Sequence, residues 1–174
     1  MKIGLIGLGR MGGNIARRLM KNGHEVVAFD RDAEAVKKLA ADGAIGADSL
    51  DDMRGKLDTP AIWWVMVPAG EPTEQTVQAI AEKAAEGDII IDGGNSHYPD
   101  SNRRTAELEK KGLLFVGSGV SGGEEGARHG PSLMPGGSDK AWPAIKEIFQ
   151  KTAAQTDGKP CCDWVCVRRF DGPI

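Results

Sequence analysis

The sequence has no excess of basic charge and no long apolar run. Its net charge is −3 and its pI is about 5.7, so it lacks the basic surface of nucleic-acid-binding domains, and nucleic acid is not an expected partner. No apolar stretch approaches the ~20 residues of a membrane-spanning helix. The N-terminal MKIGLIGLG is broken by glycines, which predicts a first strand and not a signal peptide. We therefore expect a cytoplasmic protein with no membrane partner.

Cysteine and histidine are also scarce. The three cysteines, Cys161, Cys162 and Cys166, lie near the C-terminus, and the three histidines lie far from them in sequence. Zinc sites need further ligands at set spacings, and no such spacing is present. The expected state of the cysteines is the reduced thiol of a cytosolic protein, and no metal site is predicted.

Glycine, in contrast, is abundant and clustered. There are 24 glycines among the 174 residues, about twice the usual share of roughly 7%. Four stretches contain most of them: Gly4–Gly13, Gly93–Gly94, Gly117–Gly126 and Gly130–Gly137. Clustered glycine beside apolar runs is typical of loops that approach a ligand closely, because the missing Cβ leaves the backbone accessible.

Apolar strand patterns alternate with helix patterns along the chain. The expected strands are Lys2–Ile6, Glu25–Phe29, Ala61–Val67, Asp88–Ile91 and Leu113–Val116. Helices are expected between and after them, including one over Ala33–Ala41, one capped by Thr73 and a last one capped by Ser138. Apolar strands separated by helices indicate an α/β fold of the doubly wound kind, with a mostly parallel sheet covered on both faces. Such sheets bind ligands at the carboxyl ends of their strands.

The residues Gly7-Leu8-Gly9-Arg10-Met11-Gly12 have the GxGxxG spacing of a Rossmann-type dinucleotide-binding turn. The motif follows a predicted strand and opens a predicted helix, which is the context it requires. In this pattern Gly7 makes the turn, Gly9 lets a pyrophosphate approach the backbone, and Gly12 lets helix and strand pack closely. The free N–H groups at the helix start favour an anion. These six residues are the predicted pyrophosphate site, and the alternative is a glycine-rich turn without a ligand.

Asp30 directly follows the second predicted strand and lies 30 − 12 = 18 residues after Gly12, near the spacing of a ribose-binding carboxylate. A carboxylate there accepts a hydrogen bond from the 2′-hydroxyl of NAD and repels the 2′-phosphate of NADP. Asp32 adds negative charge, whereas the guanidinium of Arg31 suits a phosphate. NAD is favoured and NADP is the alternative.

Longer stretches resemble one enzyme family. They are GLIGLGRMGGNIARRL (4–19), IIDGGNSHYPDSNRR (90–104), FVGSGVSGGEEGARHGPSLMPGG (115–137) and PCCDWV (160–165). Together they resemble the N-terminal, dinucleotide-binding domain of decarboxylating 6-phosphogluconate dehydrogenase, over residues 1–165. Related 3-hydroxyacid dehydrogenases share the fingerprint and a Ser-Gly-Gly segment but do not usually carry the segment at Gly130–Gly137. A cofactor domain of that second kind is the weaker alternative.

The resemblance implies roles for particular residues. Asn95 is implied to contact both the nicotinamide and the substrate. The substrate's carboxylate end is implied to lie at Ser121, Gly122 and Gly123. The loop after the third strand is implied to line the cofactor with Val67, Pro68 and Ala69. The residue types agree, since a hydroxyl and exposed N–H groups suit an anionic oxygen and an amide side chain carries both a donor and an acceptor.

Other polar and aromatic residues are predicted to be structural. His97 and His129 are expected in solvated loops, and Arg103-Arg104 are expected as a solvated helix start. Trp63-Trp64 are expected to pack on the two faces of a buried strand, because neighbouring strand residues point to opposite faces.

The family's reaction, part of the pentose phosphate pathway, oxidises the C3 hydroxyl of 6-phosphogluconate by hydride transfer and then releases CO2, giving ribulose 5-phosphate. The resemblance places its catalytic lysine and glutamate in a helical domain with a Gly-His-Phe-Val-Lys stretch, which also forms much of the homo-oligomer interface. Here a divergent tail, residues 166–174, follows Val165 without that stretch. We expect a truncated chain with no catalytic residue, a cofactor domain that is inactive alone. The alternative is a free-standing dinucleotide-binding module without turnover.

Overall fold

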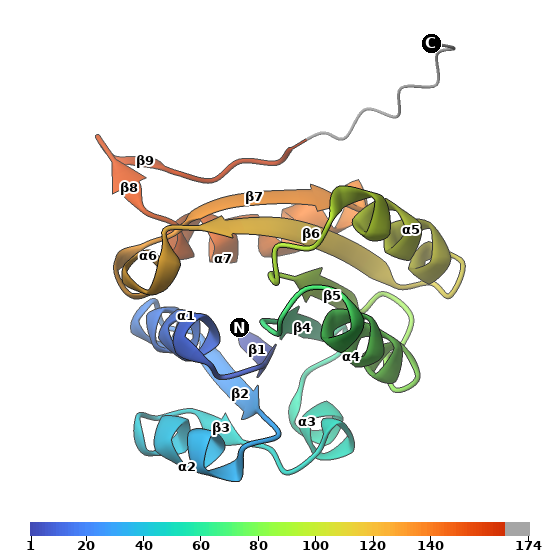
Figure 1. Cartoon of the computed structure of the whole chain (residues 1–174), viewed down its shortest axis with the longest axis horizontal. Coiled ribbons are helices and arrows are strands. Elements are labelled where there is room, and N and C mark those ends of the chain that lie inside the picture. Colours follow the sequence, from blue (N-terminus) through green and yellow to red (C-terminus); the bar gives the residue numbers. More distant parts are fainter. Residues whose placement is uncertain (166–174) are drawn as a thin grey trace.

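A seven-stranded sheet organises the chain (Figure 1). The computed structural model describes residues 1–165, so the predicted tail at 166–174 lies outside the described residues. The strand order is β3-β2-β1-β4-β5-β6-β7, with β1 to β6 parallel and β7 antiparallel to β6. The strands are β1 (Lys2–Ile6), β2 (Glu25–Phe29), β3 (Ile45–Gly46), β4 (Ile62–Val65), β5 (Ile89–Asp92), β6 (Leu114–Ser121) and β7 (Ser132–Gly137). The first six follow the 3-2-1-4-5-6 order of doubly wound dinucleotide-binding folds, which confirms the predicted fold class.

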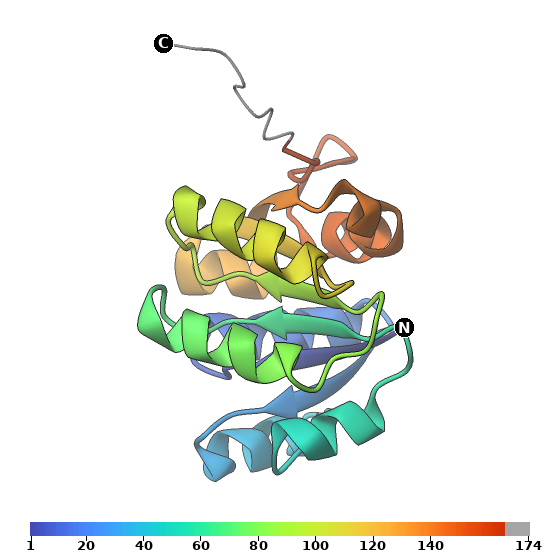
Figure 2. The same ribbon diagram turned by 90° about the vertical axis from the view of Figure 1, so that its right-hand side faces the viewer.

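Helices cover both faces of the sheet (Figures 1 and 2). One buried cluster joins the sheet to α1, α2, α6 and α7, and a second joins it to α3, α4 and α5. The helices are α1 (Arg10–Lys21), α2 (Ala33–Ala41), α3 (Leu50–Lys56), α4 (Glu71–Ala81), α5 (Tyr98–Glu109), α6 (Gly123–His129) and α7 (Trp142–Thr152). A 3-10 turn, η1 (Asp139–Ala141), precedes α7, and a small hairpin, β8 (Gln155–Thr156) and β9 (Lys159–Pro160), follows it.

The two tryptophans of β4 pack on opposite faces of the sheet, as predicted. Both are 0% exposed. Trp64 belongs to the first cluster and stacks on Phe149, with 4.7 Å between ring centroids. Trp63 belongs to the second cluster, and its indole N–H donates to the buried carboxylate of Asp88 at 3.2 Å. The same carboxylate accepts the backbone N–H of Ala61 at 2.7 Å, which satisfies a charge that would otherwise be costly to bury.

The start of α4 differs from its prediction. The helix begins at Glu71 with Gly70 at its N-cap, so Thr73 lies inside its first turn and is not the cap. Pro72 at the second helical position explains the earlier start, because its fixed φ suits the first turn and its missing N–H needs no partner there. The buried hydroxyl of Thr73 donates instead to the carbonyl of Pro68 at 2.9 Å.

The glycine-rich segment from residue 117 to residue 137 is mostly regular structure, whereas its composition predicted ligand loops. Strand β6 continues five residues beyond its predicted end, because β7 pairs with it from Val116 to Ser121. Glycine is needed within this pairing at Gly137, which has a φ of +133° and whose Cβ would collide with the backbone carbonyl oxygen of Phe115 on β6. Local sequence does not reveal such a cross-strand contact, because strand preference depends on the partner.

Candidate functional site

The glycine turn after β1 has the geometry that its spacing predicts. Gly7 has a φ of +91°, and a Cβ on it would lie 2.5 Å from the carbonyl oxygen of Met66 on the neighbouring strand connection. A Cβ on Gly12 would lie 1.9 Å from the carbonyl oxygen of Gly7. A Cβ on Gly9, in contrast, would meet no atom within 4 Å. Two glycines are therefore required by the fold itself, whereas Gly9 faces open space at the N-terminus of α1.

The start of α1 is suited to an anion. Its first turn contains no acidic residue, and Gly9 occupies the N-cap without a side chain over the helix end. The first N–H groups of a helix have no partner within the helix and carry the positive end of its dipole. Together with the open space at Gly9, these groups form a cradle that fits a pyrophosphate.

The carboxylate of Asp30 lies beside this turn. One oxygen accepts the backbone N–H of Leu8 at 2.6 Å, and the other accepts the backbone N–H of Asp32 at 2.8 Å. Asp32 caps α2 through its own carboxylate, which accepts the N–H of Glu34 at 3.0 Å. Both carboxylates at the end of β2 are thus held by backbone donors, and Arg31 between them is exposed.

A cavity of about 690 Å³ opens between the ends of β1, β2 and β4. This volume lies within the ~300–1,000 Å³ range of small-molecule sites. Six residues predicted to bind the cofactor line it: Gly7, Gly9, Asp30, Arg31, Val67 and Pro68. Leu8 and Arg10 line a second hollow on the other side of Gly9. Met11 is half-buried and packs against the core, so its backbone N–H is the group it offers to a ligand.

Asn95 follows the buried end of β5 and adopts a left-handed conformation with a φ of +57°. Its side-chain amide donates to the carbonyl of Val120 at 3.1 Å, and its side-chain oxygen accepts the N–H of Val120 at 2.8 Å. Ser121 comes next on β6, and Gly122 and Gly123 lead into α6 with φ values of +124° and +59°. All three are exposed, so the structure brings the predicted substrate residues together at one end of β5 and β6.

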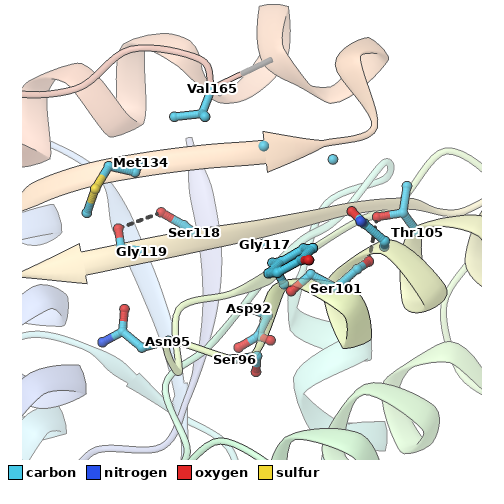
Figure 3. Close-up of a pocket in the computed structure, with 14 residues that line it drawn as sticks. Asp92, Asn95, Ser96, Ser101, Thr105, Gly117, Ser118, Gly119, Met134 and Val165 are labelled. Atoms are coloured by element: carbon cyan, nitrogen blue, oxygen red, sulfur yellow. Dashed lines mark hydrogen bonds between the residues drawn. The ribbon is translucent and has the colours of Figure 1, made fainter. Parts of the chain in front are cut away.

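A polar hollow of about 300 Å³ lies between α5, β6 and β7. Figure 3 shows Asn95 and Ser96 on the β5 side, Ser101 and Thr105 on α5, and Met134 and Val165 on the β7 side. No pattern in the sequence predicts this hollow. Of the predicted site residues, Asn95 lines it. This hollow and the cavity of about 690 Å³ have no lining residue in common.

Residues 2–166 match the family model described as the NAD binding domain of 6-phosphogluconate dehydrogenase. The chain belongs to the 6-phosphogluconate dehydrogenase family. This confirms the predicted resemblance and places the chain in the family's NAD-binding part.

Individual relatives agree with this assignment. The decarboxylating 6-phosphogluconate dehydrogenase of Candida albicans is 54% identical over 168 residues, which cover 94% of this chain and 32% of that protein. The structure of the Plasmodium falciparum enzyme, solved as apo form and in complex with NADP+ and with 6-phosphogluconate, superposes with a TM-score of 0.86 at 34% identity, covering 94% of this chain and 36% of that one. A 3-hydroxyisobutyrate dehydrogenase from Mycobacterium tuberculosis gives 0.79 at 26% identity, covering 91% of this chain and 52% of that one. The chain thus spans about a third of the length of the 6-phosphogluconate dehydrogenases it matches.

The prediction of a solvated helix start at Arg103-Arg104 is wrong for Arg104. Helix α5 begins at Tyr98, so both arginines lie in its middle. Arg103 is 43% exposed, but Arg104 is 2% exposed. Helical spacing explains the difference, because Arg104 lies on the same face as the buried Leu108 four residues later. His97 and His129 are exposed, as predicted, but His129 is the last residue of α6 and does not lie in a loop.

Arg104 is part of an ion network that the sequence did not predict. Its guanidinium donates to Asp92 at 3.2 Å and to Glu74 at 2.9 Å. Arg103 donates to the same Glu74 oxygen at 2.7 Å. Hydrogen bonding from Arg103, with a smaller contribution from Arg104, lowers the pKa of Glu74 to about 2. The sequence signal that indicates an inward-facing Arg104 is its i, i+4 spacing from the apolar Leu108, and the prediction of a solvated helix start did not use it.

Among residues 1–165, no group of three or more His, Cys, Asp or Glu side chains has an arrangement suited to a metal ion. In the same part of the chain, no helix combines the length and the apolar character needed to cross a membrane.

Proposed function

We propose that this chain binds NAD(H) across the carboxyl ends of β2, β1, β4 and β5, as the cofactor half of a 6-phosphogluconate dehydrogenase. The observation that carries the proposal is the open space in front of Gly9, between the N-terminus of α1 and the carboxylate of Asp30. A pyrophosphate in this space accepts hydrogen bonds from the first turn of the helix. The two nucleosides then extend to either side along the edge of the sheet.

The adenosine half lies toward the end of β2. The carboxylate of Asp30 is held in place by the N–H groups of Leu8 and Asp32, and its remaining lone pairs accept the ribose hydroxyls. A 2′-phosphate would meet Asp30 and Asp32 together, and at ~4 Å one such repulsion costs about 1–4 kcal/mol, depending on the local dielectric. The exposed Arg31 opposes this effect. NAD is the favoured cofactor, and NADP, named for the Plasmodium enzyme, is the alternative.

The nicotinamide half lies toward β4 and β5, where Val67, Pro68 and Ala69 line its path. NAD held there would supply the hydride acceptor for oxidation of the C3 hydroxyl of 6-phosphogluconate. Asn95 has one N–H and one lone pair left after its two hydrogen bonds with Val120, and these groups hold the nicotinamide and the substrate. Ser121, Gly122 and Gly123 offer a hydroxyl and backbone N–H groups to the substrate carboxylate.

The 174 residues by themselves turn over 6-phosphogluconate negligibly. They contain no Gly-His-Phe-Val-Lys stretch, so the family's lysine and glutamate have no counterpart in them. Loss of one acid–base group typically costs about 10²–10⁴ in rate, and here two are missing. A longer protein that carries those groups would complete the oxidative decarboxylation, with a second copy as its expected partner.

Titration of the purified 174-residue chain with NADH and NADPH, followed calorimetrically, tests this proposal. We expect binding of both, with NADH tighter. Asp32→Asn should reduce the ratio of NADH affinity to NADPH affinity several-fold. It should not destabilise α2, because asparagine is as good an N-cap as aspartate. Glu34→Gln is the matched control, since it removes a nearby charge that pairs with Lys37. Absence of binding at millimolar cofactor would contradict the proposed cofactor site. Clear reduction of NAD in the presence of 6-phosphogluconate would contradict the expectation that this chain alone is inactive.

A further inference from the structure

The buried guanidinium of Arg104 has no part in the glycine turn that is proposed to bind the pyrophosphate, so its burial needs another reason. The side chain lies on α5 and is 2% exposed, although it carries a full charge. Burial of such a charge is costly unless partners with good geometry compensate it. Its partners therefore indicate what the burial achieves.

The first partner connects Arg104 to the loop that carries Asn95. Asp92, the last residue of β5, is 1% exposed and accepts from Arg104 through one carboxylate oxygen at 3.2 Å. Its other oxygen accepts the backbone N–H of Gly94 at 2.9 Å. The turn from β5 into Asn95 is thus held through a carboxylate that Arg104 orients.

The second partner connects Arg104 to the loop after β4. Glu74, which accepts from Arg104 at 2.9 Å, lies in the first turn of α4. One residue earlier, the hydroxyl of Thr73 donates to the carbonyl of Pro68. The start of α4 and the loop that precedes it are therefore joined to the same guanidinium.

The two loops are also in direct contact. A Cβ on Gly94 would lie 2.5 Å from the carbonyl oxygen of Val67, so neither loop can move far without the other. Arg104 lies behind both of them, on the helix that packs against the sheet.

We propose that Arg104 is a positioning residue for the nicotinamide end of the cofactor, acting through Asp92 on Asn95 and through Glu74 on Val67 and Pro68. This inference depends on the proposed function, because it assumes that the nicotinamide lies over β4 and β5. The adenosine end is remote from this device. Asp30 directly follows β2, which lies three strands away from β5 in the sheet, and this separation corresponds to about 14 Å at ~4.8 Å per strand.

The test compares two ligands on the full 174-residue chain. NADH contains both nucleoside halves, whereas ADP-ribose lacks the nicotinamide. We expect Arg104→Met to weaken NADH about tenfold or more and to change ADP-ribose affinity less than twofold. Arg104→Lys should recover part of the loss, because a single ammonium keeps the charge but lacks the fork that reaches both carboxylates. The ratio of the two affinities separates positioning from general loosening, which would weaken both ligands alike.

Arg103→Met is the matched control. Arg103 is the neighbouring arginine on α5 and also contacts Glu74, but it is half-exposed and its hydrogen bonds go to Glu74 and Glu107. It should change the affinity ratio much less than Arg104→Met does, because it leaves the hydrogen bonds of Arg104 to Asp92 and Glu74 in place. If Arg104→Met fails to fold, Glu74→Gln decides, since this partner is more exposed and its loss should still weaken NADH selectively.

Three results have distinct meanings. An unchanged affinity ratio in Arg104→Met, or in Glu74→Gln where that variant decides, would overturn the positioning role. NADH binding no tighter than ADP-ribose in the unsubstituted chain would also overturn it, because the loops would then not hold the nicotinamide. Failure of both ligands to bind the unsubstituted chain would instead refute the cofactor site itself.

Discussion

Substitution of the glycines at positions 9 and 12 separates the demands of the fold from those of the ligand. A Cβ on Gly9 would meet nothing within 4 Å, and the residue's φ of −60° is open to alanine. Gly9→Ala should therefore leave the free energy of unfolding unchanged within ~0.5 kcal/mol, as for other substitutions that disturb no packing. A Cβ on Gly12 would lie 1.9 Å from a backbone oxygen. Gly12→Ala should destabilise the domain by about 3 kcal/mol, at the upper end of typical overpacking costs.

Although Gly9→Ala should leave stability unchanged, it should weaken cofactor binding. The added methyl group occupies the space through which a pyrophosphate would approach the first turn of α1. Contact between carbon and oxygen atoms needs roughly 3.5 Å, so the phosphate must withdraw. Loss of one hydrogen bond to a charged group costs about 1.5–3 kcal/mol, which corresponds to a roughly tenfold to hundredfold weaker Kd for NADH.

Two measurements on the same preparations check this reasoning. Urea unfolding gives the stability, and a NADH titration gives the affinity. Gly55→Ala is the control, because Gly55 lies in α3 with no atom within 4 Å of an added Cβ. It should stabilise the chain by about 0.5–1 kcal/mol and leave the affinity for NADH unchanged. A Gly9→Ala chain with normal stability and undiminished NADH affinity would refute the placement of the pyrophosphate.

Three further predictions concern groups outside the cofactor turn. The pKa of Glu74 is lowered to about 2, mainly by Arg103. The contribution of Glu74 to the free energy of unfolding is therefore present above pH ~4.5 and is lost as the pH falls toward 2. Urea unfolding should show that Glu74→Gln reduces this loss by about 1–2 kcal/mol after allowance for solvent screening. Burial is the largest effect that lowers the pKa of His24. The N-terminal amine and Lys151 lower this pKa further, whereas Glu147 raises it. The unfolded chain therefore takes up a proton that the folded chain does not, so stability should decline below pH ~6.5 by at most ~1.4 kcal/mol per pH unit, and His24→Phe should abolish this decline. Burial raises the pKa of Cys162 to about 12, so peptide mapping after iodoacetamide treatment of the native chain should find Cys161 modified and Cys162 protected.

The sequence predicted the features that depend on neighbouring residues. The glycine spacing after β1 is a local requirement, since Gly7 must adopt a positive φ and Gly12 must pack on the turn that precedes it. The alternation of apolar strands and helices likewise follows from local periodicity. Parallel strands then place their carboxyl ends on one edge, so the predicted site residues after β1, β2, β4, β5 and β6 gather there.

The features that the sequence did not predict depend on distant partners. Strand β7 and the extension of β6 are stabilised by each other, and taken alone each resembles a glycine-rich loop. Arg104 was predicted to be solvated because arginine usually is. Its burial becomes favourable once Asp92 and Glu74, 12 and 30 residues away, are placed around it. Neither distance has a periodicity that a sequence pattern reveals.

The pairing of Asn95 with Val120 joins the two predicted substrate stretches into one unit. A side-chain amide has a donor end and an acceptor end, and Val120 uses one of each through its carbonyl and N–H. This pairing fixes which way the amide points, because the flipped orientation would oppose donor to donor and acceptor to acceptor. Ser121 follows Val120 directly on β6, so a displacement of the loop after β5 is transmitted to the residues proposed to hold the substrate carboxylate. A device that positions Asn95 therefore acts on the substrate side of the site as well as on the cofactor side.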